Sequence, residues 1–530
     1  MMDGLPNRRS PWLLTLLVGL YAALAAAYFV LRYGGQWTDS DTANLTVATA
    51  AVVNEGTLTP THGMYNLGFT YQAVSTFIAT ISGLELLQLQ FWIYPVLAAA
   101  TLGAIAFVLY RTLTGDEVAG ALATLFLFTQ PDFLFVIFRG SHEKATWLLA
   151  MLAIFLLARS FRVFGRPASF AVYVVLFYAT ALALIASNAF FGSSFILAMA
   201  VSLVAGWAVQ QASRRRVPEN TAHTTAPRLL YVVAAAMVVW FLHMFYLYRP
   251  ALRVFLDLQG AMDKVAAVSL GSEPKFDPYA TVGWGWISTA AYLGLTMSSW
   301  TVGTWSFVIW LVTGGQLLRG QNPLKEPPQF LLWLLYGGFG MQLALSIGLD
   351  QVGAIGGNLQ HRFFPMVMLM AFPIVARAIV QLWHRNISIW RNRLLAFALC
   401  LLVLWASGAS LLKATNDPWL SNYWVFWTAP EGRAINWIEA HLHYRSVWLG
   451  VDGIRLSSRA NAAGFGAKTG NATDQWTVNM DTRDILLSRV EEGVSVSRSI
   501  PLPDLRAEHR VYDNGAVVHY HLRPRTPYQR

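Results

Sequence analysis

Residues 8–41 read RRSPWLLTLLVGLYAALAAAYFVLRYGGQWTDSD, and this stretch indicates the class of fold. Two arginines precede the uncharged run Trp12–Leu31, and the acids Asp39 and Asp41 follow it. A helix of about 20 apolar residues spans the hydrocarbon core of a bilayer, and arginines near one end of it favour the cytoplasmic side. The run is long, and no small-residue cleavage site follows it. We therefore predict a retained first membrane span with a cytoplasmic N-terminus.

Ten further apolar runs follow, which predicts about eleven helical spans in all. A hydrophobic fraction of 55% with a charged fraction of 12% is typical of a membrane protein. The longest run, Ile287–Leu318, has room for an interfacial helix beside its span. The other runs are Leu86–Leu109, Val118–Phe138, Ala145–Ala158, Ala168–Ala186, Ala189–Ala208, Leu229–Tyr248, Phe330–Leu349, Phe363–Leu382 and Leu394–Leu412.

Basic residues lie in short clusters between these runs rather than in one patch. From a cytoplasmic start, every inner loop is basic and the outer loops hold most of the acids, as the positive-inside rule requires. The net charge of +10 therefore reflects the orientation of the spans in the membrane, and we expect no nucleic acid partner. We predict a multi-pass protein of the plasma (inner) membrane, and an odd span count places the C-terminus outside.

The apolar runs stop at residue 412, and residues 413–530 have the composition of a small globular domain. We predict a helix at Ala434–His441 and a hairpin at Arg510–Leu522, because Asp513-Asn514-Gly515 tolerates positive φ between two strand-like flanks. Other strands are predicted at Ser446–Val451, Trp476–Asn479 and Val494–Ile500. The predicted architecture is an all-α polytopic membrane bundle over residues 1–412, followed by an extracytoplasmic α/β domain.

The first outer loop, residues 32–85, carries Asp39 and Asp41 just beyond the first span. Either carboxylate can act as a general base toward a hydroxyl or help to bind a divalent cation. The alternative is a solvated loop whose aspartates cap a helix that begins near Thr42. Further along, His62 and Tyr65 belong to a stretch rich in aromatic and amide side chains, which bind sugars well.

The second outer loop is short and strongly polar. It reads Arg139-Gly140-Ser141-His142-Glu143-Lys144, and Asp132 lies just before it within the third run. Because the next run, Ala145–Ala158, is too short for a full span, we expect this loop to dip below the outer headgroups. Ionisable groups at that depth are costly unless paired or hydrated, so they are functional candidates. The alternative is a set of interfacial anchors.

A third polar cluster, His361-Arg362-Phe363 with Pro365, opens the tenth span from the outside. Arg362 stands at the level of a lipid-linked phosphate, whose oxygens a guanidinium can bind in a bidentate way. The alternative is an ordinary headgroup anchor. The outer loop 249–286 mixes acids and bases, and we expect an amphipathic stretch that closes over the site as a lid.

Together these features resemble the GT-C superfamily of membrane glycosyltransferases, which includes protein O-mannosyltransferases, aminoarabinose transferases and oligosaccharyltransferase catalytic subunits. The resemblance covers most of the chain. It rests on Asp39 and Asp41 beyond the first span, the acidic and basic second outer loop, His361-Arg362-Phe363 with Pro365, and the terminal external domain. Each motif is loose, and their order along the chain is more telling than any one of them.

The resemblance implies an inverting glycosyltransferase that moves a hexosyl or pentosyl group from a polyprenyl-phosphate carrier to a hydroxyl on a glycan, lipid or protein outside the cytoplasm. Asp41 or Asp39 matches the catalytic acid, and Arg362, with His361 beside it, matches the arginine that contacts the carrier phosphate. Asp132, His142 and Glu143 match the family's second-loop position approximately. With Arg139, Lys144, His62 and Tyr65 they complete the predicted substrate-binding set. No metal is obligatory, although Asp39-Ser40-Asp41 is compatible with Mg²⁺ or Mn²⁺.

This sequence departs from the family in two places. It has Asp-Ser-Asp where many relatives have adjacent Asp and Glu, which leaves open which aspartate is the base. It also lacks the tryptophan-tryptophan-aspartate run of oligosaccharyltransferases, so the resemblance does not extend to transfer of a whole oligosaccharide to asparagine. A polyprenyl-linked glycan polymerase or ligase and a lipid or solute transporter are the rival functions, although the span interiors hold few of the paired charges of coupled carriers.

Overall fold

The structure of the chain is a computed structural model. It describes residues 11–33, 40–58, 70–214, 226–246, 256, 259–260, 262–264, 266–267, 270, 286–319, 321, 323–324, 326–351, 359–384, 389–414, 428–442, 447–450, 468–469, 482–489, 492 and 504–522.

Helices account for most of the described chain, and the described residues of the predicted apolar runs are mostly helical, although Leu86–Leu109 and Val118–Phe138 each extend over more than one helix. The helices before the second outer loop are α1 (Pro11–Tyr33), α2 (Ser40–Glu55), α3 (Thr70–Ser82), α4 (Leu86–Gln88), the π-helical η1 (Leu89–Ile93), α5 (Tyr94–Thr114), α6 (Glu117–Phe128) and α7 (Pro131–Phe138). Those after it are α8 (Glu143–Arg162), α9 (Pro167–Ser187), α10 (Ala189–Arg214), α11 (Ala226–Tyr246), α13 (Trp286–Leu318), α14 (Pro327–Gln351), α15 (Leu359–His384), α16 (Ile389–Ala414) and α17 (Ala429–His441).

Within the described residues, eight helices are long and apolar enough to cross a membrane, namely α5, α8, α9, α10, α13, α14, α15 and α16. The protein is therefore a polytopic membrane protein. The third predicted run, Val118–Phe138, is not straight, because α6 and α7 meet at 74° and form one bent span or a re-entrant pair. The runs Trp12–Leu31 and Leu229–Tyr248 form α1 and α11, but their crossing of the membrane stays a prediction. The count of about eleven spans is thus not confirmed.

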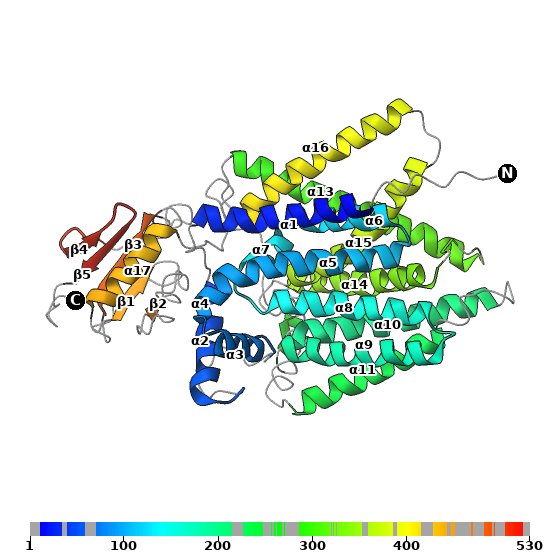
Figure 1. The fold of residues 1–530 in the computed structure, drawn as a ribbon, viewed down its shortest axis with the longest axis horizontal. Coiled ribbons are helices and arrows are strands. Elements are labelled where there is room, and N and C mark those ends of the chain that lie inside the picture. Colours follow the sequence, from blue (N-terminus) through cyan, green and yellow to red (C-terminus); the bar gives the residue numbers. More distant parts are fainter. Residues whose placement is uncertain are drawn as a thin grey trace.

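Figure 1 shows the bundle helices side by side, with α2, α3 and α4 at one end and the small sheet beyond that same end. The first outer loop and the C-terminal region therefore lie on one side of the bundle. This arrangement agrees with the predicted topology, although which side faces the cytoplasm remains a prediction.

The break between α6 and α7 is stabilised by two distant helices. Because α6 ends at Phe128 and the chain bends before Pro131, the Phe128 and Thr129 carbonyl groups have no helical partners. Tyr21 of α1 donates to the Phe128 carbonyl at 3.1 Å, and Ser410 of α16 donates to the Thr129 carbonyl. Within a membrane protein, freed backbone groups need such internal partners. Hydrogen bonds from two other helices of the bundle therefore stabilise the break between α6 and α7.

The C-terminal region forms a five-stranded mixed sheet in the order β2-β1-β3-β5-β4. Its strands are β1 (Val447–Gly450), β2 (Lys468–Thr469), β3 (Thr482–Ser488), β4 (His509–Asp513) and β5 (Val517–His521). The predicted hairpin is confirmed as β4–β5, with Gly515 at φ +83° in its turn. The predicted helix is α17 and the first predicted strand is β1, whereas β2 and β3 were not predicted. Trp476–Asn479 and Val494–Ile500 lie outside the described residues.

α16 continues to Ala414, two residues beyond the predicted run Leu394–Leu412, and the domain boundary after residue 412 stays a prediction. Lys413 therefore belongs to the last helix of the bundle. That the sheet forms a separate extracytoplasmic domain stays a prediction.

Candidate active site

The turn between α7 and α8 forms a buried cluster of charges. The guanidinium of Arg139 pairs with the Glu143 carboxylate at 2.9 Å and lies 4.8 Å from the centroid of the Phe135 ring. Lys144 is only 7% exposed, and its Nζ donates to the Ile137 carbonyl at 3.2 Å. Burying such cations is costly without partners. The predicted second-loop residues are thus held in fixed positions.

The expectation that this loop dips because its span is short needs correction. α8 has 20 residues, since it includes Glu143 and Lys144 in its first turn and Arg159 and Arg162 in its last. At about 1.5 Å per residue this length matches the hydrocarbon core. The charged residues lie at the two ends of α8. Arg139 and Lys144 are buried because neighbouring helices pack around them, and not because the span is short.

The first outer loop docks directly on this charged turn. Tyr71 of α3 donates to the Gly140 carbonyl at 3.1 Å, and Ser75, one turn later, lies 2.9 Å from the Tyr94 hydroxyl. The rings of Tyr71 and Tyr94 meet edge to face at 5.8 Å, and Lys144 lies 5.8 Å from the centroid of the Tyr94 ring. Helix α3 of the first outer loop therefore packs on the second predicted cluster.

The start of α10 joins Arg362 to the same turn. Asn188 caps the end of α9. Its side-chain amide nitrogen lies 2.7 Å from Nε2 of His142. Phe190, two residues later, packs against Phe363 at 5.4 Å and has the Arg362 guanidinium 5.5 Å from its ring centroid. Asn188 was missed by the sequence reasoning, although a polar residue in the short turn between two apolar runs was a usable signal.

Asp350 positions the beginning of α15. Its fully buried carboxylate accepts the backbone N–H of Leu359 at 2.9 Å and that of Gln360 at 2.7 Å. A carboxylate here satisfies first-turn amides and complements the helix dipole. The next two residues, His361 and Arg362, are both exposed. The buried Asp350 carboxylate thus fixes the first turn of α15, from which His361 and Arg362 are exposed.

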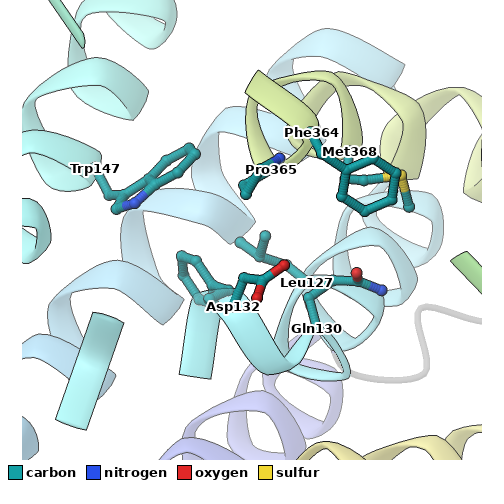
Figure 2. A pocket seen from close by; sticks show the side chains of 8 residues that line it. Leu127, Gln130, Asp132, Trp147, Phe364, Pro365 and Met368 are labelled. Carbon is teal, nitrogen blue, oxygen red and sulfur yellow. The ribbon is translucent and has the colours of Figure 1, made fainter. Parts of the chain in front are cut away.

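A hollow opens where α6 and α7 break. It is small and partly open to solvent, and Figure 2 shows Asp132 pointing into it. The residues that line it come from the break, from α8 and from α15. They are Leu127, Gln130, Asp132, Phe133, Trp147, Phe364, Pro365 and Met368. The hollow is apolar apart from Asp132 and Gln130.

Charged residues of the predicted site stand one helical turn from the lining of this hollow. Residues four apart share one face of a helix. Glu143 therefore lies on the same face of α8 as Trp147, and His361 on the same face of α15 as Pro365. This register places Glu143 and His361 one helical turn from residues that line the hollow.

Lys413 faces this region from the last helix, and the sequence reasoning did not select it. Its ammonium group is attracted by the carboxylate of Asp132. The bond from Ser410 to the Thr129 carbonyl holds this part of α16 against the break. A lysine at the outer end of a span departs from the positive-inside pattern, and that departure was the available signal.

The first-loop residues remain largely undescribed. Asp39, His62 and Tyr65 lie outside the described residues, as does most of the predicted lid 249–286. α2 begins at Ser40, close to the predicted helix start, and Asp41 is its second residue. The structure gives no position for the Asp41 side chain, so the role of either aspartate stays a prediction.

Metal binding is likewise a prediction that the structure does not test. Among the described side chains, no three His, Cys, Asp or Glu groups come together as metal ligands. The pattern that prompted the expectation of Mg²⁺ or Mn²⁺, Asp39-Ser40-Asp41, falls outside that set.

No protein-family model matches the chain, and no curated protein matches it in sequence. Solved structures do match in fold. The apo oligosaccharyltransferase of Archaeoglobus fulgidus has a TM-score of 0.56 at 11% identity, over 93% of this chain and 71% of that one. The Archaeoglobus fulgidus oligosaccharyltransferase AglB in complex with an inhibitory peptide and a dolichol-phosphate has a TM-score of 0.53 at 12% identity, over 91% and 70%.

A weaker likeness links the chain to ArnT from Cupriavidus metallidurans, with a TM-score of 0.42 at 11% identity over 96% of this chain and 98% of that one. The Archaeoglobus enzyme is a GT-C glycosyltransferase. At such identities the likeness concerns the fold alone, and at this level the predicted resemblance to the GT-C superfamily is confirmed.

Proposed function

Because the chain folds as GT-C glycosyltransferases do, we propose that it is a membrane glycosyltransferase. It takes a sugar from a polyprenyl-phosphate carrier and transfers it to an acceptor hydroxyl on the extracytoplasmic face of the plasma (inner) membrane. A solved structure of the same fold, the archaeal oligosaccharyltransferase, was obtained with a dolichol-phosphate, which supports a carrier lipid here. The acceptor is a glycan, a lipid or a protein.

One observation carries this proposal. α3 docks on the charged turn between α7 and α8, and the hollow that contains Asp132 is lined by the α6–α7 break, by α8 and by the start of α15. A carrier lipid can bring its phosphate to that end from within the bilayer, while the acceptor arrives from the aqueous side. A site at this boundary suits both substrates.

In the proposed reaction, the acceptor hydroxyl attacks the anomeric carbon of the sugar as Asp41 or Asp39 removes its proton. The bond between that carbon and the phosphate oxygen breaks, and its electron pair leaves with the phosphate. Arg362 stabilises the developing negative charge, with Arg139 and Lys144 nearby as further cations. Direct displacement inverts the anomeric configuration.

The test is donor consumption by the purified protein in lipid nanodiscs, with a panel of polyprenyl-phosphate sugars. We expect at least a hundredfold loss of turnover in Asp41→Asn or Asp39→Asn, the scale of a lost general base, and a strong loss in Arg362→Ala. Arg506→Ala is the matched control, because its side chain is 95% exposed in the C-terminal region. Turnover that survives in both aspartate variants excludes the proposed bases, and no turnover with any donor excludes the transferase.

A transporter remains the second candidate, because the 74° bend between α6 and α7 is a feature that transporter helices share. Inverted repeats pair such breaks in both halves of a transporter, whereas the described residues contain this bent pair alone. Lipid scrambling or solute flux in proteoliposomes without donor consumption would favour this candidate.

A further inference from the structure

Helix α3 turns a polar face toward the bundle. Its buried side chains are Tyr71, Gln72 and Ser75. Tyr71 donates to the Gly140 carbonyl, and the Ser75 hydroxyl lies within hydrogen-bond distance of the Tyr94 hydroxyl. A helix in a loop surrounded by water would instead bury its apolar side chains against the protein. The inside of α3 is thus the opposite of what a water-exposed helix shows.

The apolar side chains lie together on the outer face of the same helix. Val74, Phe77 and Ile81 are spaced three and four residues apart, so they form one stripe. They are 48%, 64% and 70% exposed. α3 has no charged residue, whereas the water-facing side of a helix usually carries several. Such a stripe indicates contact with a membrane or with a partner.

The depth of α3 favours lipid as the partner of this stripe. α9 has 21 residues, which at about 1.5 Å each match the hydrocarbon core. The Thr70 hydroxyl, at the start of α3, lies 3.5 Å from the carbonyl oxygen of Ala183. That carbonyl is one turn, or about 6 Å, inside the end of α9 at Ser187. Figure 1 shows α3 beside this end of α9, so α3 begins where acyl chains meet headgroups.

The exposed apolar surface of α9 leads up to α3. Val175 and Leu182 on α9 are exposed, and Leu182 immediately precedes the residue beside Thr70. Because α9 is long and apolar enough to cross the membrane, its exposed side chains face acyl chains. Lipid that covers the end of α9 therefore reaches the start of α3.

From these observations we propose that α3 is an interfacial membrane anchor. Val74, Phe77 and Ile81 insert among the acyl chains just below the headgroups, and this insertion holds Tyr71 and Ser75 against the bundle. Amphipathic helices at membrane surfaces bury their apolar face about 5–10 Å into this boundary. The inference concerns the lipid contacts of the first outer loop and does not depend on transferase activity.

The accessibility of nitroxide labels to oxygen and to a water-soluble nickel chelate tests this surface, and the single native cysteine makes labelling specific. In a Cys400→Ser background in phospholipid nanodiscs, Phe77→Cys and Ile81→Cys label the stripe. Phe397→Cys, on the exposed face of α16, is the lipid reference, and Val511→Cys, an exposed apolar site in the C-terminal region, is the water reference. We expect the oxygen-to-nickel ratio at both stripe positions to exceed the water reference by at least about threefold.

Thr80 provides the matched control on the same helix. It is exposed, but it lies about 90° from the middle of the stripe, so the ratio at Thr80→Cys should be lower than at either stripe position. The holding role is tested by Phe77→Ser combined with Ile81→Ser. Hydrogen exchange of the α3 amides should become at least about tenfold faster in this double variant, and Thr80→Ser should leave it unchanged.

Water-like ratios at both stripe positions overturn the proposal, because the stripe then faces solvent. Low accessibility to both agents also overturns it, because a protein surface, such as a second copy of the chain, then covers the stripe. Exchange in α3 that the double variant leaves unchanged shows that lipid does not hold the helix. Donor consumption tests the transferase separately, so neither proposal fails with the other.

Discussion

Asp484 connects two histidines of one strand through a single carboxylate oxygen. Its Oδ1 lies 3.0 Å from Nε2 of His519 and 3.0 Å from Nδ1 of His521, and both the acid and His519 are about 1% exposed. Burial by itself raises the pKa of Asp484, but the hydrogen bonds and charges of the two histidines outweigh it and hold this pKa below its ordinary value. The ionised acid therefore stabilises the pairing of β3 with β5.

The sign of the resulting pH dependence follows from that lowered pKa. The stabilisation is complete above the ordinary aspartate pKa of about 3.9 and is lost as the pH falls through the lower folded-state value. We expect faster hydrogen exchange in β3 and β5 as the pH drops from 5 to 3, after correction for intrinsic exchange. Asp484→Asn should lose about 1–3 kcal/mol at neutral pH and most of this acid sensitivity. The same acid midpoint in parent and variant would contradict the assignment.

Asp350 is a second acid whose effect is local. Asp350→Ala removes the acceptor of two amides at the start of α15 and should destabilise that turn by about 1–2 kcal/mol. Hydrogen exchange mass spectrometry should show faster exchange at Leu359 and Gln360. Asp504→Ala, which removes an acceptor for the Arg506 amide in an exposed turn, is the matched control. Unchanged protection at both α15 amides would show that another group caps the helix.

Between elements, α13 and α14 are joined by a reciprocal pair of tryptophans. The indole N–H of Trp310 donates to the Trp333 carbonyl at 2.8 Å, and that of Trp333 donates to the Trp310 carbonyl at 2.9 Å. Each ring lies over a glycine of the other helix, Trp310 over Gly337 and Trp333 over Gly314. The two rings stack at 5.3 Å. Small residues at such a crossing let membrane helices approach closely.

A methyl group at this crossing should separate the two helices. In Gly337→Ala the new Cβ would stand 2.9 Å from the Trp310 ring, closer than packing allows. We expect a loss of about 1–3 kcal/mol from overpacking, seen as a lower melting temperature in detergent. Gly315→Ala on α13 is the control, because no atom lies within 4 Å of the place that its new Cβ would occupy. Equal melting temperatures for the two variants would exclude a tight crossing.

One hydrogen bond between the first and second outer loops can be removed without deleting a ring. Tyr71→Phe keeps the ring packing against Tyr94 and deletes the donor to the Gly140 carbonyl. We expect a loss of about 1–3 kcal/mol and faster hydrogen exchange in α3, with little change in α9. Tyr231→Phe on an exposed part of α11 serves as the comparison. Protection of α3 that does not change would mean that apolar contacts alone dock the loop.

Across the molecule as a whole, the two ends of the bundle should face different compartments. In a Cys400→Ser background, Ala507→Cys places a thiol in the C-terminal region, and Arg319→Cys places one at the opposite end, after α13. A membrane-impermeant maleimide applied to intact cells should label the first and reach the second only after permeabilisation. The reverse pattern would invert the proposed topology and remove the site from the extracytoplasmic face.

The membrane helices and the β4–β5 hairpin could be located from the amino-acid order without any structure. A bilayer acts on each segment separately, because every span must be apolar and must satisfy its own backbone, so composition is enough to locate it. The hairpin was equally local, since Asp513-Asn514-Gly515 defines its turn. The charged turn at Arg139–Lys144 and Arg362 at the start of α15 could also be selected this way, as charges at the ends of apolar runs.

The contacts between residues of different helices depend on tertiary packing. The break at Gln130 depends on Tyr21 and Ser410, which lie far away in the sequence and carry no local sign of that role. The contact of Arg362 with Phe190 and the attraction of Lys413 to Asp132 likewise join separate helices. Lateral packing between spans leaves little trace in composition, because apolar faces toward lipid and toward protein look alike. For that reason the hollow could not be predicted from the sequence, although Asp132, which lines it, could be selected.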